Sequence, residues 1–156
     1  MSTTTSDERL SPREQDAWMG SLRTHAVLTR ALDGELESEH RLSVHAFEVL
    51  RALADEPCRR LRMSALAARV GLTPSGATRL VTGLYQAGLL VRDACPEDGR
   101  VTSARLTQTG AEKLRATERT HTAGVRRLFA ERLAGAEMAE LASLLGRLES
   151  DADDDR

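Results

Sequence analysis

The sequence predicts a mainly α-helical protein with one small β-hairpin, and three observations support this prediction. Only 3% of the 156 residues are aromatic, while leucine and alanine are abundant, a composition that favours helices over a large sandwich or barrel. Apolar residues recur at helical spacing through most of the chain. A short apolar run at residues 89–93 and a stretch of alternating polarity at residues 101–106 instead flank an Asp98-Gly99 turn, as in a β-hairpin. The length suits a single domain with a real core.

Two helices are expected in the first third of the chain, after a polar segment, residues 1–10, that we expect to be disordered. The first helix starts at Pro12 and ends near residue 39, and its apolar positions are Trp18, Leu22, Leu28, Leu32 and Leu36. Ser43 can cap the second helix, which ends at 55–57 and has its buried face at Phe47, Leu50 and Leu53.

Two further helices follow, with a very short turn between them. Ser64 is expected to cap the first, and Gly71 ends it. The second spans residues 74–87, where Thr73 can cap the free amides and Pro74 suits the first turn. A short helix, a glycine-containing turn and a second helix match the helix-turn-helix unit, and the hairpin directly after it makes a winged version. In that unit the second helix enters the DNA major groove.

Two helices are expected after the hairpin. Thr109 and Glu112 have the spacing of a capping box and can start a long helix. The last helix runs from about residue 136 to 149, and its apolar face is formed by Leu141, Leu144, Leu145 and Leu148. The acidic end of the chain, residues 151–156, is expected to be solvated.

The exposed face of the 74–87 helix is unusually bare. Ala77, Leu80, Val81 and Leu84 form its apolar arc, and the opposite arc carries Ser75, Thr78, Arg79, Thr82 and Gly83. Only one of these exposed side chains, Arg79, is long. Small side chains let a helix approach base edges closely, and an arginine reaches a guanine edge or a phosphate. The alternative is a tight helical hairpin whose surface happens to be small.

The charge distribution favours an anionic partner for the same region. Residues 57–106 hold eight arginines and three acids, a balance of +5, and the remainder holds 14 basic and 21 acidic residues, a balance of −7. The net charge of −2 therefore hides a basic segment within an acidic protein. Nucleic acid is the commonest partner of such a segment, although a chance cluster of solvated arginines is the alternative.

These residues resemble the MarR family of winged-helix transcription regulators. The specific pieces are the string MSALAARVGLTPSGATRLVTGLYQAGLLVR, the hairpin string Asp98-Gly99-Arg100, and Leu106-Thr107-Gln108-Thr109-Gly110. The family's wing typically has Asp, any residue and Arg, followed by a strand that ends in Leu-Thr-x-x-Gly, and the chain fits this pattern. It departs at Thr82-Gly83, where the family often has Asp-Arg. An acid there can brace the wing arginine.

The resemblance implies a homodimer that binds double-stranded DNA. It implies an N-terminal dimerisation helix at 11–40, a winged helix-turn-helix domain at 41–108 and C-terminal dimerisation helices at 109–150. Arg100 would enter the minor groove. The expected DNA contacts are Thr73, Ser75, Thr78, Arg79, Thr82 and Arg100. We expect a regulator, most simply a repressor, of a pseudo-palindromic operator, with no cofactor and no enzyme activity.

A small-molecule effector is a further implication, because many relatives bind phenolic or other small aromatic anions between the dimer core and the winged domain. Trp18 packs in the core or dimer by default, or it lines such a cavity. Its expected neighbours are Leu22, His25 and Phe47, with Glu48 and Arg105 as polar anchors.

Three alternatives stay open. Cys58, before an arginine pair, and Cys95 could sense oxidants, although plain free thiols are the simpler interpretation. Glu39-His40 and Glu118-x-x-His121 could bind a metal if the first and fifth helices meet. A helical scaffold dimer that does not bind DNA is the third. No apolar run is long enough for a membrane span and no signal peptide is recognisable, so we expect a cytoplasmic protein.

Overall fold

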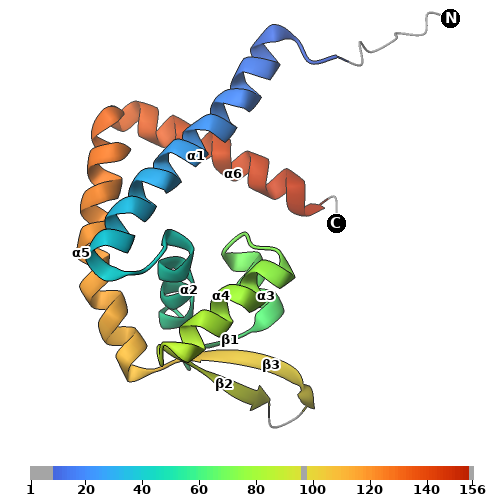
Figure 1. Cartoon of the computed structure of the whole chain (residues 1–156). Helices are drawn as coiled ribbons and strands as arrows, with labels where there is room; N and C mark the ends of the chain where they lie inside the picture. The colour runs from blue at the N-terminus through green and yellow to red at the C-terminus, as the bar shows by residue number, and fades with distance from the viewer. Residues whose placement is uncertain (1–8, 96–97, 155–156) are drawn as a thin grey trace, which may run out of the picture.

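The computed structural model describes residues 9–95 and 98–154, and it describes side chains for these residues except 93–101 and 150–154. Helices α1 and α6 form one part of the molecule, a small sheet with α2, α3 and α4 forms the other, and α5 runs along one side and joins them (Figure 1). The elements are α1 (Pro12–His40), α2 (Val44–Ala54), β1 (Arg60–Arg62), α3 (Met63–Arg69), α4 (Pro74–Gln86), β2 (Leu90–Cys95), β3 (Asp98–Leu106), α5 (Gln108–Leu128), the 3-10 turn η1 (Ala130–Arg132) and α6 (Gly135–Asp154). The predicted fold, mainly α with a small β-hairpin, is confirmed.

Side-chain caps define where the helices begin. The Ser43 hydroxyl accepts a hydrogen bond from the Ala46 amide, and Thr73 accepts one from Gly76, both as predicted. Two predicted caps are wrong. Ser64 lies inside α3, which begins at Met63 directly after β1 and has no side-chain cap. Thr107, and not Thr109, caps α5.

The sheet has a third strand that the sequence analysis did not predict. Its order is β1-β3-β2, with both pairs antiparallel. Arg60 pairs with Arg105, and Leu90 pairs with Leu106. Strand β1 has only three residues, and a segment so short carries too little alternation to be recognised without its partner.

The core lies in the part of the molecule formed by the sheet with α2, α3 and α4, here called the winged part. Its largest fully buried side chains include Leu36 of α1, Phe47, Leu50 and Leu53 of α2, Leu66 of α3, Val81 of α4 and Leu90 of β2. The Thr107 hydroxyl fixes the start of α5 to the segment between α4 and β2, because it donates to the carbonyls of Gly88 and Leu89, each at 2.9 Å. Gly110 is required one turn later, since a Cβ there would collide with the Leu89 carbonyl.

The C-terminal half of α1 packs against α5. The helices approach closely at Gly124, where an added Cβ would lie 2.6 Å from the Leu32 side chain. An ion pair between Arg127 and Glu35, and a 2.8 Å contact between His40 Nε2 and the Thr120 hydroxyl, join the same two helices. Within the described part of the chain, no helix is both long enough and apolar enough to cross a membrane.

Candidate nucleic-acid interface

The helix-turn-helix unit is formed by α3 and α4. Helix α3 ends at Arg69 with Val70 as its C-cap, and Gly71 follows with a φ of +65°, the left-handed conformation that glycine adopts most easily. Arg69, the last residue of α3, forms ion pairs with Glu56 and Asp55, which directly follow α2. This arginine of the basic segment is therefore paired within the protein.

Helix α4 turns its apolar arc inward and its small polar side chains outward. Ala77 and Val81 are buried, whereas Ser75, Thr78 and Arg79 are exposed. The Thr78 hydroxyl donates to the Pro74 carbonyl at 2.9 Å, and the half-buried Thr82 donates to the Thr78 carbonyl at 2.7 Å. Each threonine oxygen then keeps lone pairs that can accept from a base or a water.

Of the remaining predicted DNA contacts, the structure describes the side chains of Thr73 and Arg79 but not that of Arg100. Thr73 caps α4, and its oxygen also lies 3.4 Å from the Ser75 hydroxyl. Arg79 makes no ion pair or hydrogen bond with its side chain among the described residues. Arg100 lies in β3, but its side chain is outside the described residues. The structure thus brings five of the six residues to one helix and its cap.

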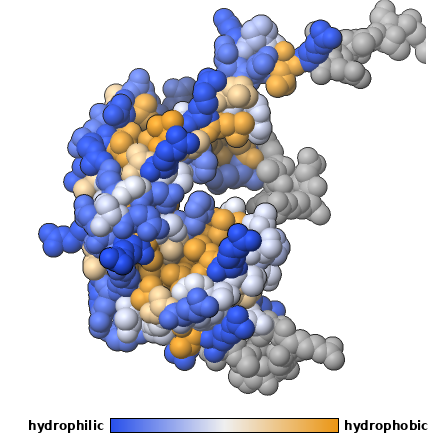
Figure 2. All heavy atoms as spheres, in the orientation of Figure 1, coloured by the Kyte–Doolittle hydropathy of each residue, from blue (hydrophilic) through white to orange (hydrophobic). Residues whose placement is uncertain are grey.

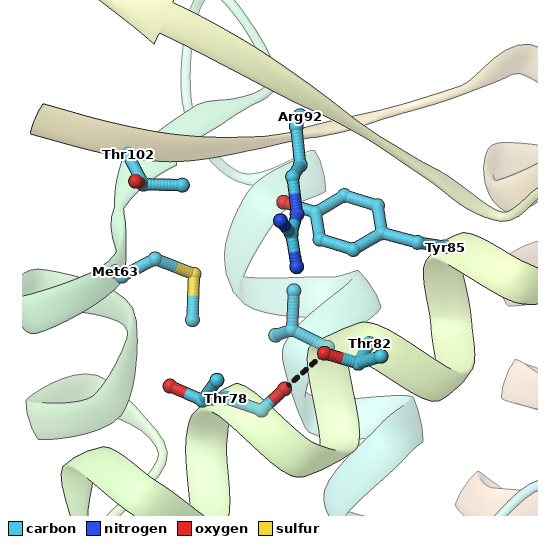
Figure 3. Close-up of a pocket in the computed structure, with 7 residues that line it drawn as sticks. Met63, Thr78, Thr82, Tyr85, Arg92 and Thr102 are labelled. Carbon is cyan, nitrogen blue, oxygen red and sulfur yellow. Dashed lines mark hydrogen bonds between the residues drawn. The ribbon is translucent and has the colours of Figure 1, made fainter. Parts of the chain in front are cut away.

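Arg92 is a site residue that was not predicted from the sequence. It lies on β2, and its guanidinium carbon is 5.1 Å from the centre of the Tyr85 ring of α4. Both side chains line a pocket between α4 and the sheet (Figure 3). The arginine was visible in the basic segment, but its position opposite α4 depends on how the sheet pairs. Arg60 and Arg62 of β1 are also exposed, but they flank Leu61, which is in register with Ala104 and Arg92, so they belong to the other face of the sheet.

The six expected effector-binding residues are not brought together within one chain. Phe47 is buried in α2, and Glu48 beside it pairs with Arg51 at 2.7 Å. Arg105 is exposed on β3, opposite β1. Trp18 and Leu22 are 59% and 47% exposed, and the rise of a helix places Trp18 about 27 Å along α1 from the buried Leu36.

His25, the last of the six, lines a different hollow. This hollow of about 720 Å³ lies between α1, the end of α5 and α6, and Leu28, Leu128, Leu141 and Leu145 also line it. Its lining is therefore mainly apolar. The expected cavity between the dimer core and the winged part is not formed by these six residues of a single chain.

His121 of α5 takes the place beside Phe47. The two rings stack with their centres 4.3 Å apart, and His121 Nε2 lies 3.8 Å from a Glu48 carboxylate oxygen. Helices α1 and α5 do meet, but His40 contacts Thr120 instead of His121. No three of the described His, Cys, Asp and Glu residues cluster as metal ligands would. Cys58 is exposed, and the Cys95 side chain lies outside the described residues.

The stack of His121 on Phe47 predicts acid-sensitive stability. The pKa of His121 is lowered, first because burial penalises the charged ring, while the Glu48 carboxylate opposes this and Arg51 adds to it. In the unfolded chain the ring has its ordinary pKa, near 6.5. As the pH falls below that value, the unfolded chain gains a proton that the folded chain does not, so stability should fall.

The substitution His121→Phe keeps an aromatic ring on Phe47 and removes the titration. Urea unfolding at a fixed protein concentration, across a pH series from about 7.5 to 5, should show the free energy of unfolding falling more steeply for the wild type. Equal slopes for the two proteins would contradict this role of His121.

A short helix, a tight turn, an exposed helix face and a hairpin beside it define a winged helix-turn-helix protein, a class that binds DNA. A family model for the MarR family matches residues 42–102. The fold is similar to AbsC, a MarR family transcriptional regulator from Streptomyces coelicolor, with a TM-score of 0.84, 31% identity, and coverage of 93% of this chain and 97% of that one.

Two more solved structures are informative. Sco3205, a MarR family regulator from Streptomyces coelicolor solved in complex with DNA, has a TM-score of 0.86 and 30% identity, over 92% of this chain and 94% of that one. The organohalide-sensing regulator RdhR, solved in its 2,4-dichlorophenol-bound form, has a TM-score of 0.79 over 97% of this chain and 89% of that one, but at 17% identity the similarity concerns the fold. Comparison with curated protein sequences gave no match.

The chain belongs to the MarR family of transcriptional regulators. In this fold the β2–β3 hairpin corresponds to the wing, and α4 to the second helix of the helix-turn-helix unit.

Proposed function

We propose that the protein is a homodimeric repressor that binds a pseudo-palindromic operator with α4 of each subunit. The observation that carries the proposal is the exposed face of α4, where Arg79 extends from a surface of small polar side chains and has no partner among the described residues. An unpaired guanidinium on such a face is free to bind a guanine edge or a phosphate. The DNA complex of Sco3205 supports the same use of this fold.

Dimerisation is supported by apolar surface on the two ends of the chain. Trp18, Leu22 and Val27 of α1, and Leu144, Leu145 and Leu148 of α6, are each at least 43% exposed. The space-filling view shows hydrophobic residues at the surface in the part formed by these helices (Figure 2). A single chain leaves this surface in water, and a second copy would bury it. The dimer would place two α4 helices on one duplex.

We further propose that a small ligand releases the repressor from DNA. The hollow of about 720 Å³ beside His25 has a mainly apolar lining with few polar groups, which suits a small aromatic molecule. RdhR, of the same fold, is solved with 2,4-dichlorophenol. Among the alternatives, a thiol sensor would use Cys58, which is exposed, and a scaffold dimer would leave Arg79 without a role.

A gel shift with the DNA upstream of the protein's own gene tests the proposal. We expect retardation of this DNA at concentrations that leave a scrambled duplex of equal length free. Arg119→Ala is the control for the arginine variants of α4 and the wing. It removes one exposed arginine of α5, outside α4 and the sheet, and should retard this DNA like the wild type. Equal affinity of the wild type for both duplexes at all salt concentrations would support a scaffold or a non-specific binder instead.

Arg100 of β3 is the residue that we expect to contact DNA from the wing. Arg100→Ala should weaken operator binding, and if the guanidinium contacts a phosphate the slope of log K against log salt should flatten by about one unit. If Arg100 instead binds a narrow minor groove, the loss should be largest on operators with A·T-rich flanks. Titrations at four salt concentrations on both kinds of flank measure this. Wild-type affinity and slope on all of these sites would exclude Arg100 from the interface.

A further inference from the structure

A pocket of about 290 Å³ lies between the recognition helix and the wing (Figure 3). Thr78, Thr82 and Tyr85 line it from α4, and Arg92 and Thr102 line it from the sheet. It contains one positive side chain and no carboxylate among its lining residues. Its electrostatic character therefore favours an anion.

Arg92 is held in this pocket by the Tyr85 ring. The guanidinium carbon lies 5.1 Å from the ring centre, within the range of a cation–π interaction. Arg92 is exposed and forms no ion pair with a described residue. The aromatic face orients the guanidinium and leaves its N–H groups available for an acceptor.

The Tyr85 hydroxyl in the same pocket lacks a hydrogen-bond partner. Its oxygen is buried, and the hydroxyl proton has no acceptor within the described structure. Burial raises the pKa of Tyr85, and Arg92 opposes this rise through its positive charge and by approaching the hydroxyl oxygen as a donor. The neutral hydroxyl is a donor at neutral pH. A buried donor without an acceptor is unfavourable, and an acceptor oxygen of a bound molecule would satisfy it.

The pocket lies where a duplex would bring a phosphate. Thr78 and Thr82 share the polar face of α4 with Ser75 and Arg79, the face that we propose enters the major groove. The β2–β3 hairpin, proposed to reach the neighbouring minor groove, forms the opposite wall. The sugar–phosphate backbone separates these two grooves, so it passes between α4 and the hairpin.

We propose that Arg92 and the Tyr85 hydroxyl form a binding site for one phosphodiester of the DNA backbone, between the groove bound by α4 and the groove bound by the wing. The proposal rests on the proposed DNA-binding function. It assigns two donors to one anionic group: a charged guanidinium, fixed by the ring, and a neutral hydroxyl. This contact would fix how deeply α4 enters the groove, and it would be independent of base sequence.

The substitution Tyr85→Phe separates this role from a structural one. It removes the unpartnered hydroxyl and keeps the ring under Arg92, so thermal stability without DNA should be unchanged or higher. DNA affinity should fall about tenfold, because a hydrogen bond to a charged group is lost. Arg92→Gln should also weaken binding and reduce the salt slope by about one unit. Arg119→Gln, on α5, is the matched control and should change neither quantity.

The decisive probe is a duplex selected by the wild-type protein from a random-sequence pool, prepared with single neutral methylphosphonates at successive backbone positions. One position in each half-site should weaken wild-type binding yet add little to the loss in Tyr85→Phe and Arg92→Gln, because both changes remove the same contact. Losses that add at every position, or wild-type affinity of Tyr85→Phe, would overturn this site. If the wild type selects no duplex, the proposed DNA-binding function itself fails.

Discussion

Leu144→Asp combined with Leu148→Asp is expected to abolish high-affinity binding to the full operator. Both leucines lie on one face of α6 and are 43% and 68% exposed in the single chain. In the proposed dimer they would be buried, so the substitutions would place two unpaired carboxylates in an apolar interface. The subunits should then separate or unfold. Sedimentation equilibrium should show loss of the dimer, and footprints should show at most weak, salt-sensitive protection of half-sites.

A matched control uses the same helix and the same charge change. Ala139→Asp combined with Ser143→Asp places two carboxylates on the opposite, exposed side of α6, because successive helical residues differ by about 100°. This variant should remain dimeric and bind the operator like the wild type. A folded monomer of the leucine variant that still protects the full site at wild-type affinity would refute the dimeric mode of binding.

Arg79→Ala is expected to weaken specific DNA binding by about 1–3 kcal/mol, the amount that a good arginine–base contact contributes. The side chain is exposed and unpaired among the described residues, so its removal should change the free energy of unfolding by no more than about 0.5 kcal/mol. Binding isotherms on the selected operator, at one fixed salt concentration, measure the first quantity, and urea unfolding measures the second.

The specificity of the Arg79 contact can be tested with Arg79→Lys. Lysine keeps the charge and loses the planar, bidentate geometry. If Arg79 binds a guanine edge, Lys should restore non-specific binding but not discrimination against operators changed at that base pair. If affinity for the operator is unchanged in Arg79→Ala, the residue does not contact DNA and the principal observation behind the proposed function loses its force.

The local features of this fold could be predicted from sequence, and those that depend on distant pairing could not. Ser43 and Thr73 cap their helices as predicted, since a cap depends on the next three residues. For α5 the predicted cap was Thr109, from its spacing to Glu112, whereas the cap in the structure is Thr107. The structure selects Thr107 because its hydroxyl also reaches the carbonyls of Gly88 and Leu89, 19 and 18 positions away in the chain.

In the candidate site, too, the local features could be predicted from sequence and the contacts between distant segments could not. The exposed residues of α4 follow from helical periodicity alone, and the structure places them on one face. The proximity of Arg92 to Tyr85 could not be deduced, because it depends on the position of β2 beside α4. His121 was noted only as a possible metal ligand, whereas its actual partners, Phe47 and Glu48, come from α2. Sequence spacing within α5 contains no information on that contact.

The proposal that a dimer presents two α4 helices to one operator is tested most directly by a hydroxyl-radical footprint of the wild-type protein on its selected duplex. Two recognition helices related by a two-fold axis should occupy successive major grooves, so we expect symmetric protection of two half-sites with centres about 34 Å apart, one turn of the duplex. A single unsymmetric protected tract, or uniform protection without sequence preference, would contradict the account.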